Sequence, residues 1–369
     1  MKSARARRLR GHQAAATCCI PSRQTPALVA TAGEDGRVCF FDLRCKDVQL
    51  MIELGNDHPV SSLCYNQDNE SVIYVSAGAQ VKCFDVHKAT SWKPLETYRH
   101  NKDEINQVVC NSRSSYIAAA DDNGDIKIID IREQCLYKTL RAGHSSICGT
   151  VQFLPWKPWE VISGGLDSKL VMWEFSRGRA YHVLDFGINA SGGGAPQCYN
   201  PAFVHAIAVP EIDMLDRVKK MCAVARGDGV ISVVDIESEI SCGKVKKMPE
   251  PRKESRMRPK TSLIDAGQET ATMLHLDYSL GGHTAAASSV TFSLFGERGK
   301  FIVSGGNDQA VKVWDWRRYL EDAQISGETV VPFSVNLQKK VNWLCTTPSV
   351  SENLVVCDTS KVVKVYTIS

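Results

Sequence analysis

The hydrophobic and polar positions of the chain repeat one pattern, which is clearest in residues 301–317, FIVSGGNDQAVKVWDWR. An apolar run ends at Gly305-Gly306-Asn307-Asp308, and apolar residues then return on alternate positions at Val311 and Val313. Alternation on both sides of a short Gly/Asn/Asp segment predicts two antiparallel strands joined by a tight turn. Such a unit cannot bury its apolar face alone, so the repeats must pack on one another. Similar units occupy residues 29–44, 117–132 and 161–175.

The spacing of the units fits a four-stranded repeat. The residues that close the second strand of each unit are Asp42, Asp85, Asp130, Glu174, Asp235, Asp315 and Thr367. The first three intervals, of 43, 45 and 44 residues, match the roughly 40–45 residues of a four-stranded propeller blade. The later intervals are longer, and we predict loop insertions at about residues 189–200 and 237–280.

The last unit ends at residues 362–368, VVKVYTI, and no outer strand follows it. Residues 6–12, ARRLRGH, parallel the outer strand of an internal unit at residues 137–144. We therefore predict that the N-terminal strand completes the last blade and closes the ring, which removes exposed sheet edges. The predicted fold is all-β, a β-propeller that forms one domain over residues 1–369. Seven blades follow from the spacing, with six or eight as the alternatives.

Three units share polar residues at matching places. Gly-His precedes the unit, a Ser or Thr and an Asp follow four residues apart, and the closing aromatic residue comes six residues after the Asp. In this pattern the chain resembles the WD-repeat β-propeller family. The residues are His12, Thr31 and Asp35 in the first unit, His144, Ser163, Asp167 and Trp173 in the fourth, and His283, Ser304, Asp308 and Trp314 in the sixth.

The resemblance implies a structural role for these residues. In that family they form a buried hydrogen-bond relay from Trp through Ser or Thr and His to Asp, and buried polar groups are costly unless each donor finds an acceptor. Their composition is that of a catalytic triad, but we assign them to the fold. The second, third and seventh units depart from the pattern at Gly78-Ala79, Asn123-Gly124 and Ser360. We expect these three blades to be held by packing alone.

The sequence carries no motif of a catalytic site. It contains no GxSxG, P-loop or HExxH motif, and no GxGxxG between a strand and a helix. The 14 cysteines include no CxxC pair and no zinc-type His/Cys cluster, which favours reduced thiols in the cytosol or nucleus. No apolar run reaches the roughly 18 residues of a membrane span. We therefore expect no enzyme activity, no cofactor, no metal and no membrane insertion.

Three units end in an Asp-x-Arg sequence, which we call a box. Trp314-Asp315-Trp316-Arg317 resembles the WDxR box of substrate receptors for cullin-RING ubiquitin ligases, and Asp42/Arg44 and Asp130/Arg132 keep Asp and Arg without Trp. Strand alternation is expected to place Asp and Arg on the same side. The guanidinium can then fork onto carboxylates or carbonyls of a partner, or pair with the Asp of its own blade.

Further landmarks keep their order along the chain and are similar to one family member that is grouped with those receptors. They lie at residues 103–106, 120–128, 144–148, 200–202, 305–308 and 340–344. The resemblance implies a non-catalytic protein-binding propeller, a substrate receptor that docks on the damaged-DNA-binding adaptor of a cullin-RING ligase. The alternative is a ligase-independent WD-repeat scaffold of a chromatin or signalling complex. The expected partners are the adaptor and a target protein, bound by a monomer within a hetero-complex in the nucleus and cytoplasm.

A basic run lies at Lys244–Lys260, KVKKMPEPRKESRMRPK, with eight Lys or Arg and two Glu. Its charge exceeds the net +3 of the whole chain, so the remaining residues are net negative. The run is either a nuclear-import or nucleic-acid-binding segment or a solvated loop kept extended by charge and proline. No aromatic residues interleave with its basic residues, so we do not expect nucleic-acid binding by base stacking.

Trp156 and Trp159 fall on a turn between two predicted strands. Either residue can serve as an exposed aromatic anchor for a partner or as part of the core.

Overall fold

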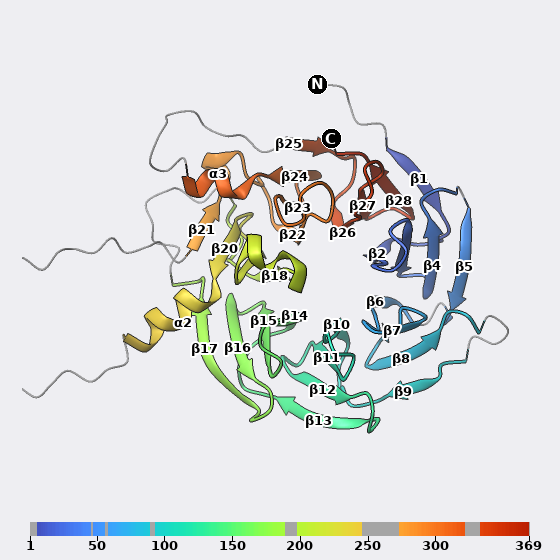
Figure 1. Cartoon of the computed structure of the whole chain (residues 1–369), viewed down its shortest axis with the longest axis horizontal. Coiled ribbons are helices and arrows are strands. Elements are labelled where there is room, and N and C mark those ends of the chain that lie inside the picture. Colours follow the sequence, from blue (N-terminus) through green and yellow to red (C-terminus); the bar gives the residue numbers. More distant parts are fainter. Residues whose placement is uncertain are drawn as a thin grey trace, which may run out of the picture.

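The computed structural model describes residues 6–45, 47–55, 58–88, 93–188, 198–245, 273–321 and 333–368. Seven four-stranded antiparallel sheets surround a common axis as the blades of a propeller (Figure 1). Their innermost strands contact one another in sequence around the axis, and the last contacts the first. The predicted all-β fold of seven blades is therefore confirmed.

The strands of blades 1 to 4 are given from the axis outward. Blade 1 contains β2 (Ala16–Pro21), β3 (Leu28–Gly33), β4 (Arg37–Asp42) and β5 (Val48–Glu53). Blade 2 contains β6 (Val60–Tyr65), β7 (Val72–Ala77), β8 (Gln80–Asp85) and β9 (Glu96–Tyr98). Blade 3 contains β10 (Ile105–Cys110), β11 (Tyr116–Asp121), β12 (Ile126–Asp130) and β13 (Cys135–Leu140). Blade 4 contains β14 (Cys148–Phe153), β15 (Glu160–Gly165), β16 (Lys169–Glu174) and β17 (Arg179–Asp185).

Blades 5 to 7 follow the same order and carry the few helices. Blade 5 contains β18 (Val204–Ala208), β19 (Met221–Arg226), β20 (Ile231–Asp235) and β21 (Met273–Leu276). Blade 6 contains β22 (Ala287–Phe292), β23 (Ile302–Gly306), β24 (Ala310–Trp314) and β25 (Phe333–Asn336). Blade 7 contains β26 (Val341–Thr346), β27 (Leu354–Asp358), β28 (Val362–Tyr366) and β1 (Arg7–Arg10). The helices are η2 (Ile212–Met214), α1 (Leu215–Val218), α2 (Ile236–Val245), η3 (Tyr278–Leu280) and α3 (Trp316–Glu321).

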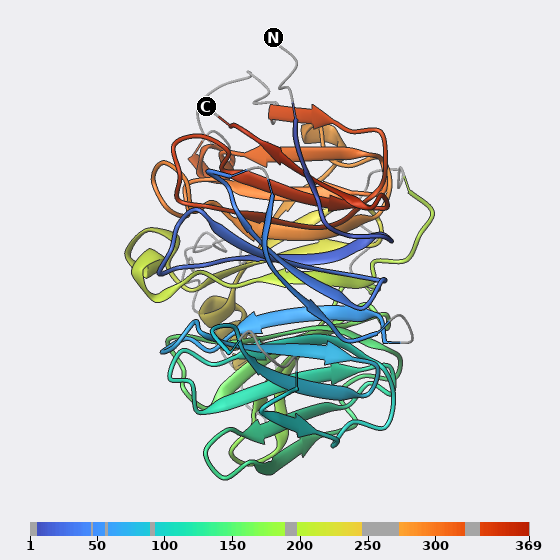
Figure 2. The same cartoon turned by 90° about the vertical axis from the view of Figure 1, so that its right-hand side faces the viewer.

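The N-terminal strand closes the ring, as the sequence predicted. β1 pairs antiparallel with β28, and Leu9 lies opposite Val363. The side chain of Leu9 is buried between blades 7 and 1 with Phe41 and Val365. The two ends of the chain are thus held in one sheet (Figure 2).

Every innermost strand carries a β-bulge near its start, where residues are inserted relative to the partner strand. The bulge residues are Thr17, Ser61 with Ser62, Asn106, Gly149, His205, Ser288 and Asn342. Five of them donate a side-chain hydrogen bond to a backbone carbonyl of the next blade. These bonds run from Thr17 to Val60 (2.5 Å), Ser61 to Ile105, Asn106 to Cys148 (3.2 Å), Ser288 to Val341 (2.6 Å) and Asn342 to Ala16 (2.9 Å).

The blade topology separates the loops onto two faces. Neighbouring strands are antiparallel, so the innermost and third strands of every blade end on the same face, which we call the C-end face. The loops between first and second strands and those between third and fourth strands lie there. All other loops lie on the opposite face, the N-end face.

The predicted loop insertions need one correction. Residues 237–280 were expected to be a loop, but α2 covers their beginning, and β21 near their end is the outermost strand of blade 5. The β-strand returns because blade 5 needs a fourth strand to cover its apolar side, where Leu276 is fully buried. Residues 189–197 and 246–272 lie outside the described part, and with them most of the insertions and of the basic run.

Ring closure by β1 has a testable consequence. Leu9→Ala should lower the free energy of unfolding by about 2–5 kcal/mol, because it leaves a cavity between the first and last blades. Urea unfolding measures the change. Arg10→Ala in the same strand is the matched control, because Arg10 is exposed and should shift stability little. Equal urea midpoints for Leu9→Ala and Arg10→Ala would contradict a role of Leu9 in closing the ring.

Candidate functional site

The relay residues of blades 4 and 6 lie within hydrogen-bond distance of one another. In blade 4 the indole N–H of Trp173 donates to Ser163 Oγ (2.8 Å), which lies 2.8 Å from His144 Nε2. His144 Nδ1 lies 3.0 Å from Asp167 Oδ1. Blade 6 repeats these contacts at 3.0, 2.8 and 3.0 Å among Trp314, Ser304, His283 and Asp308.

Blade 1 has the same arrangement without the indole. His12 Nε2 lies 2.8 Å from Thr31 Oγ1, and His12 Nδ1 lies 3.1 Å from Asp35 Oδ1. Phe41 occupies the place of the Trp and is buried. Burial lowers the pKa of His12 despite the neighbouring Asp35. These side chains are buried in the blades, where they hold turns in place.

The relay also shifts the acidity of its carboxylates. Burial alone raises the pKa of Asp167, but the hydrogen bonds from His144 and from the Ser145 N–H outweigh it and bring the pKa below its ordinary value. The pKa of Asp308 is lowered in the same way through His283 and the Thr284 N–H. The charged carboxylate is thus the form that the fold stabilises.

The expectation that blades 2, 3 and 7 are held by packing alone is wrong. In blade 2 the buried hydroxyl of Ser76 accepts a hydrogen bond from the Ser62 N–H at 2.8 Å. In blade 3 the amide of Asn101 donates to Asp121 at 2.9 Å. In blade 7 the fully buried Asp358 forms an ion pair with Lys364. In these blades other hydrogen bonds and ion pairs replace the relay, because the polar groups of a buried turn still need hydrogen-bond partners.

Blade 5 contains a polar chain that sequence spacing did not reveal. Arg226 Nη1 donates to Ser232 Oγ at 3.1 Å, and Ser232 Oγ lies 3.0 Å from His275 Nδ1. Arg226 also forms an ion pair with Asp228. His275 lies beyond the insertion, so no fixed interval connects it to the other residues.

The three Asp-x-Arg boxes all lie on the C-end face, but strand alternation does not orient them. β4 ends at Asp42, β12 at Asp130 and β24 at Trp314, so each Arg follows the strand rather than continuing it. Arg317 is part of helix α3. Strand alternation was therefore the wrong reason to expect Asp and Arg on the same side. The boxes share the C-end face because each follows the third strand of its blade.

The box arginines differ in what they contact. Arg44 pairs with its own Asp42, with Nε–Oδ1 at 3.0 Å and Nη2–Oδ2 at 2.7 Å, and these hydrogen bonds lower the pKa of Asp42. The Arg132 N–H donates to Asp130 Oδ1 at 2.9 Å. The guanidinium of Arg132 is exposed and has no hydrogen bond or ion pair with any residue that the structure describes.

Arg317 is tied into its own chain. Its guanidinium lies 5.6 Å from the Trp316 ring centroid and donates to the backbone carbonyl of Arg217 in helix α1 of blade 5. Asp315 pairs instead with Arg318, with Nε–Oδ2 at 3.1 Å. Arg317 therefore links blade 6 to the long loop of blade 5.

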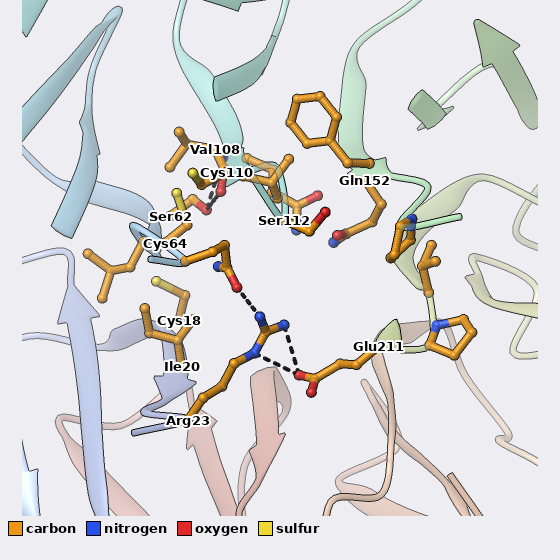
Figure 3. Close-up of a pocket in the computed structure, with 18 of the residues that line it drawn as sticks. Cys18, Ile20, Arg23, Ser62, Cys64, Val108, Cys110, Ser112, Gln152 and Glu211 are labelled. Atoms are coloured by element: carbon orange, nitrogen blue, oxygen red, sulfur yellow. Dashed lines mark hydrogen bonds and ion pairs between the residues drawn. The ribbon is translucent and has the colours of Figure 1, made fainter. Parts of the chain in front are cut away.

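Ion pairs connect the C-end loops of blades 1, 5 and 6. Arg23 of blade 1 reaches Glu211 of blade 5, with Nε–Oε1 at 3.0 Å, as Figure 3 shows. Arg298 of blade 6 binds the other oxygen of Glu211 at 2.5 Å. A cavity of 240 Å³ lies beside them and is lined by Cys64 and Cys110, among other residues. Burial raises the pKa of the Cys110 thiol to about 12 and that of Cys64 well above its ordinary value. These cysteines are neutral thiols, and within the described ranges no group of three His, Cys, Asp or Glu side chains is placed to hold a metal ion.

The C-end face also exposes apolar side chains in three of its loops. Trp159 of blade 4 is 45% exposed, Ile212 of blade 5 is 59% exposed and Val350 of blade 7 is 95% exposed. Trp156 is half-buried and packs against the core between blades 4 and 5. Of the two tryptophans, Trp159 is the exposed one. Exposed aromatic and aliphatic groups beside arginines are the composition of protein-binding surfaces.

The blade relay and the seven-bladed ring give this chain the fold of a WD-repeat β-propeller, and that fold is suited to protein binding. The family model "WD domain, G-beta repeat" matches residues 275–315. The model "Nucleolar protein 10-like, N-terminal domain" matches residues 2–142. No helix within the described residues is long and apolar enough to cross a membrane.

Two curated relatives and one solved structure illustrate the similarity. The chain is 28% identical over 240 residues to the WD repeat-containing protein 53 homolog of Dictyostelium discoideum, covering 60% of this chain and 62% of the relative. It is 24% identical to the GATOR2 complex protein WDR24 of Danio rerio, covering 42% of this chain and 20% of the relative. The WD40 β-propeller domain of Doa1 superposes with a TM-score of 0.66 at 14% identity, covering 99% of this chain and 97% of that domain, which supports the fold alone. The resemblance expected from the landmarks at residues 103–344 is to WD repeat-containing protein 53, of which the first of these relatives is a homolog.

The relay predicts a pH-dependent contribution to stability. Because the folded pKa of Asp167 is lowered, its stabilisation is present above the unfolded pKa, near 3.9, and is lost as pH falls through the folded value. Asp167→Asn should therefore lower the free energy of unfolding by about 1–3 kcal/mol at neutral pH, and the difference from wild type should shrink below about pH 4. Chemical unfolding across this pH range measures both. A difference that stays constant down to low pH would contradict the charged relay.

Proposed function

We propose that this propeller is a non-catalytic protein-binding subunit, the substrate receptor of a cullin-RING ubiquitin ligase. Its C-end face docks on the damaged-DNA-binding adaptor, and another part of its surface holds the target protein. The observation that carries the proposal is the set of three Asp-x-Arg boxes on one face, of which the Arg44 and Arg132 side chains are exposed. The similarity to WD repeat-containing protein 53 supports it.

The contacts of the arginines set their expected order of importance. Arg132 has no side-chain partner within the described residues, so it can bind a carboxylate or carbonyl without breaking an existing pair. Arg44 must share or exchange Asp42. Arg317 must release the carbonyl of Arg217. Arg317 was the strongest candidate from the sequence, and the contacts favour Arg132 instead.

The alternative is a ligase-independent scaffold. The similarity to a protein named as part of the GATOR2 complex favours it, because that relative works within an assembly. A scaffold also uses exposed groups such as Trp159, Ile212 and Val350. It does not need the boxes, so arginine substitutions distinguish the two functions. Nuclear and cytoplasmic localisation stays a prediction under either function.

Affinity purification from cells with mass spectrometry tests the proposal. The full chain is compared with Arg132→Ala and Arg317→Ala. Arg141→Ala is the control, because Arg141 is an exposed arginine on the N-end face. We expect adaptor and cullin to copurify with wild type and Arg141→Ala, and to be reduced about tenfold or more by Arg132→Ala, as for a loss of at least 1.4 kcal/mol. Arg317→Ala should have a smaller effect.

Two results would count against the receptor function. Adaptor and cullin absent from the wild-type sample would favour the scaffold alternative, with the remaining copurified proteins as its partners. Adaptor binding that all three variants retain would show that the boxes are not the contact. Melting temperatures of the purified variants exclude unfolding as the cause of any loss.

A further inference from the structure

Five aromatic rings meet where blades 3 and 4 adjoin on the C-end face. Tyr116 and Tyr137 come from blade 3, and Phe153, Trp159 and Phe175 from blade 4. Phe175 is fully buried at the base of the cluster. Tyr116 lies in β11 and Tyr137 in β13, whereas Phe153 ends β14, Trp159 directly precedes β15 and Phe175 directly follows β16. The two sets of strands form neighbouring sheets (Figure 1).

The rings hold Trp159 in a fixed position at the surface. Its ring centroid lies 5.5 Å from Phe175, 5.8 Å from Tyr116 and 6.5 Å from Tyr137. Trp159 is nevertheless 45% exposed, so a large apolar side chain is supported from below and open to solvent. We call Tyr116, Tyr137 and Trp159 the aromatic platform. An aromatic group that is already ordered loses little conformational entropy when a partner binds.

Two cations without ion-pair partners border this platform. Arg132 stands two residues after Asp130, which lies opposite Tyr116 in the β11–β12 pair. The ammonium of Lys138 lies 6.0 Å from the Tyr137 ring centroid. Neither Arg132 nor Lys138 forms an ion pair with any described residue. Both charges are therefore available to a partner.

The charged groups on the blade 4 side of the platform are paired with one another. Glu174 binds Arg177 at 3.2 Å and Arg179 at 3.4 Å. Lys157 binds Glu160 at 3.0 Å. The platform thus has an unpaired positive charge on its blade 3 side, next to an exposed tryptophan.

We propose that the aromatic platform and Arg132 form a docking site for a protein segment that presents a carboxylate beside an apolar side chain. The guanidinium binds the carboxylate in a fork, and the apolar side chain packs on the exposed face of Trp159. This site shares Arg132 with the proposed adaptor contact and therefore rests in part on the proposed function. It adds Trp159 and a partner chemistry that the proposed function does not assign.

The local charges favour a protein segment over a nucleic acid. A nucleic-acid strand brings a negative charge with every nucleotide, but Asp130 and Glu174 lie beside the platform together with the cations. The Asp130 carboxylate accepts only the backbone N–H groups of Arg132 and Glu133. It would repel a continuous phosphate backbone, whereas one carboxylate can be placed on Arg132 alone.

Selection from a randomised peptide library displayed on phage tests the proposal with the full chain. We expect the selected peptides to be enriched in Asp or Glu next to aromatic, Leu or Pro residues. Labelled synthetic copies are then titrated by fluorescence anisotropy. Trp159→Ala should weaken their binding about tenfold or more. Arg132→Glu should weaken acidic peptides and leave the ring cluster intact.

Two controls keep the outcome clear. Arg141→Glu on the N-end face should bind as wild type, and Trp159→Phe should retain folding if Trp159→Ala does not. The proposal is overturned if no acidic, apolar peptides are enriched, or if those selected bind the Trp159 and Arg132 variants as tightly as wild type. Displacement of the peptides by oligothymidine at comparable concentration would assign the platform to single-stranded nucleic acid instead. Arg132 is common to this experiment and the adaptor purification, but Trp159 is not part of any Asp-x-Arg box. Trp159→Ala therefore tests the platform alone, and its failure is distinguishable from failure of the proposed function.

Discussion

The fold depends on closing a ring of seven sheets so that no blade is left with an open side. Two kinds of contact achieve this. Strand β1 supplies the outer edge of blade 7, and Leu9 fills the space between the first and last blades. Around the axis, side chains at the strand bulges donate to carbonyls of the following blade, including the bond from Asn342 back to Ala16. Because every blade packs on two neighbours, a defect at the closure affects the whole ring. Rigid blades in turn fix where each surface loop stands, which is what a binding face requires.

Much of the fold was readable from the sequence, and the reason is local. The four-residue spacing of Ser163 and Asp167 recurs in blades 1 and 6 because both residues lie at one turn of a blade. The resemblance to the WD-repeat family then implied their relay with His144. The N-terminal closure was also readable, because the outer-strand pattern missing at one end of the chain appears at the other. The polar pairs in blades 2, 3, 5 and 7 follow no shared interval, and they were missed for that reason.

The candidate site was readable only in part, because its state depends on contacts between distant segments. Sequence places an Asp and an Arg in each box but does not reveal the partner of the guanidinium. The Arg317 guanidinium donates to the backbone carbonyl of Arg217 in helix α1, a hundred positions earlier. The strand was expected to continue at this point, but helix α3 begins at Trp316 instead. Trp316 is buried and donates to the Gly299 carbonyl at 3.1 Å. The absence of a described partner for the Arg132 guanidinium and the exposure of Trp159 likewise depend on how blades 3 and 4 pack together. The surface of this propeller therefore depends on packing between segments that are distant in the sequence.

The C-end face is the proposed partner-binding face. Hydrogen–deuterium exchange tests this most directly, by comparing the full chain alone with the chain purified together with its cellular partners. The account predicts slower exchange on binding in residues 131–134 and 154–159, which carry Arg132 and Trp159. Loops of the N-end face at residues 141–147 and 166–168 should exchange as in the free chain, apart from any second surface that holds a target. Protection confined to the N-end face, with the loops of Arg132 and Trp159 unchanged, would contradict it.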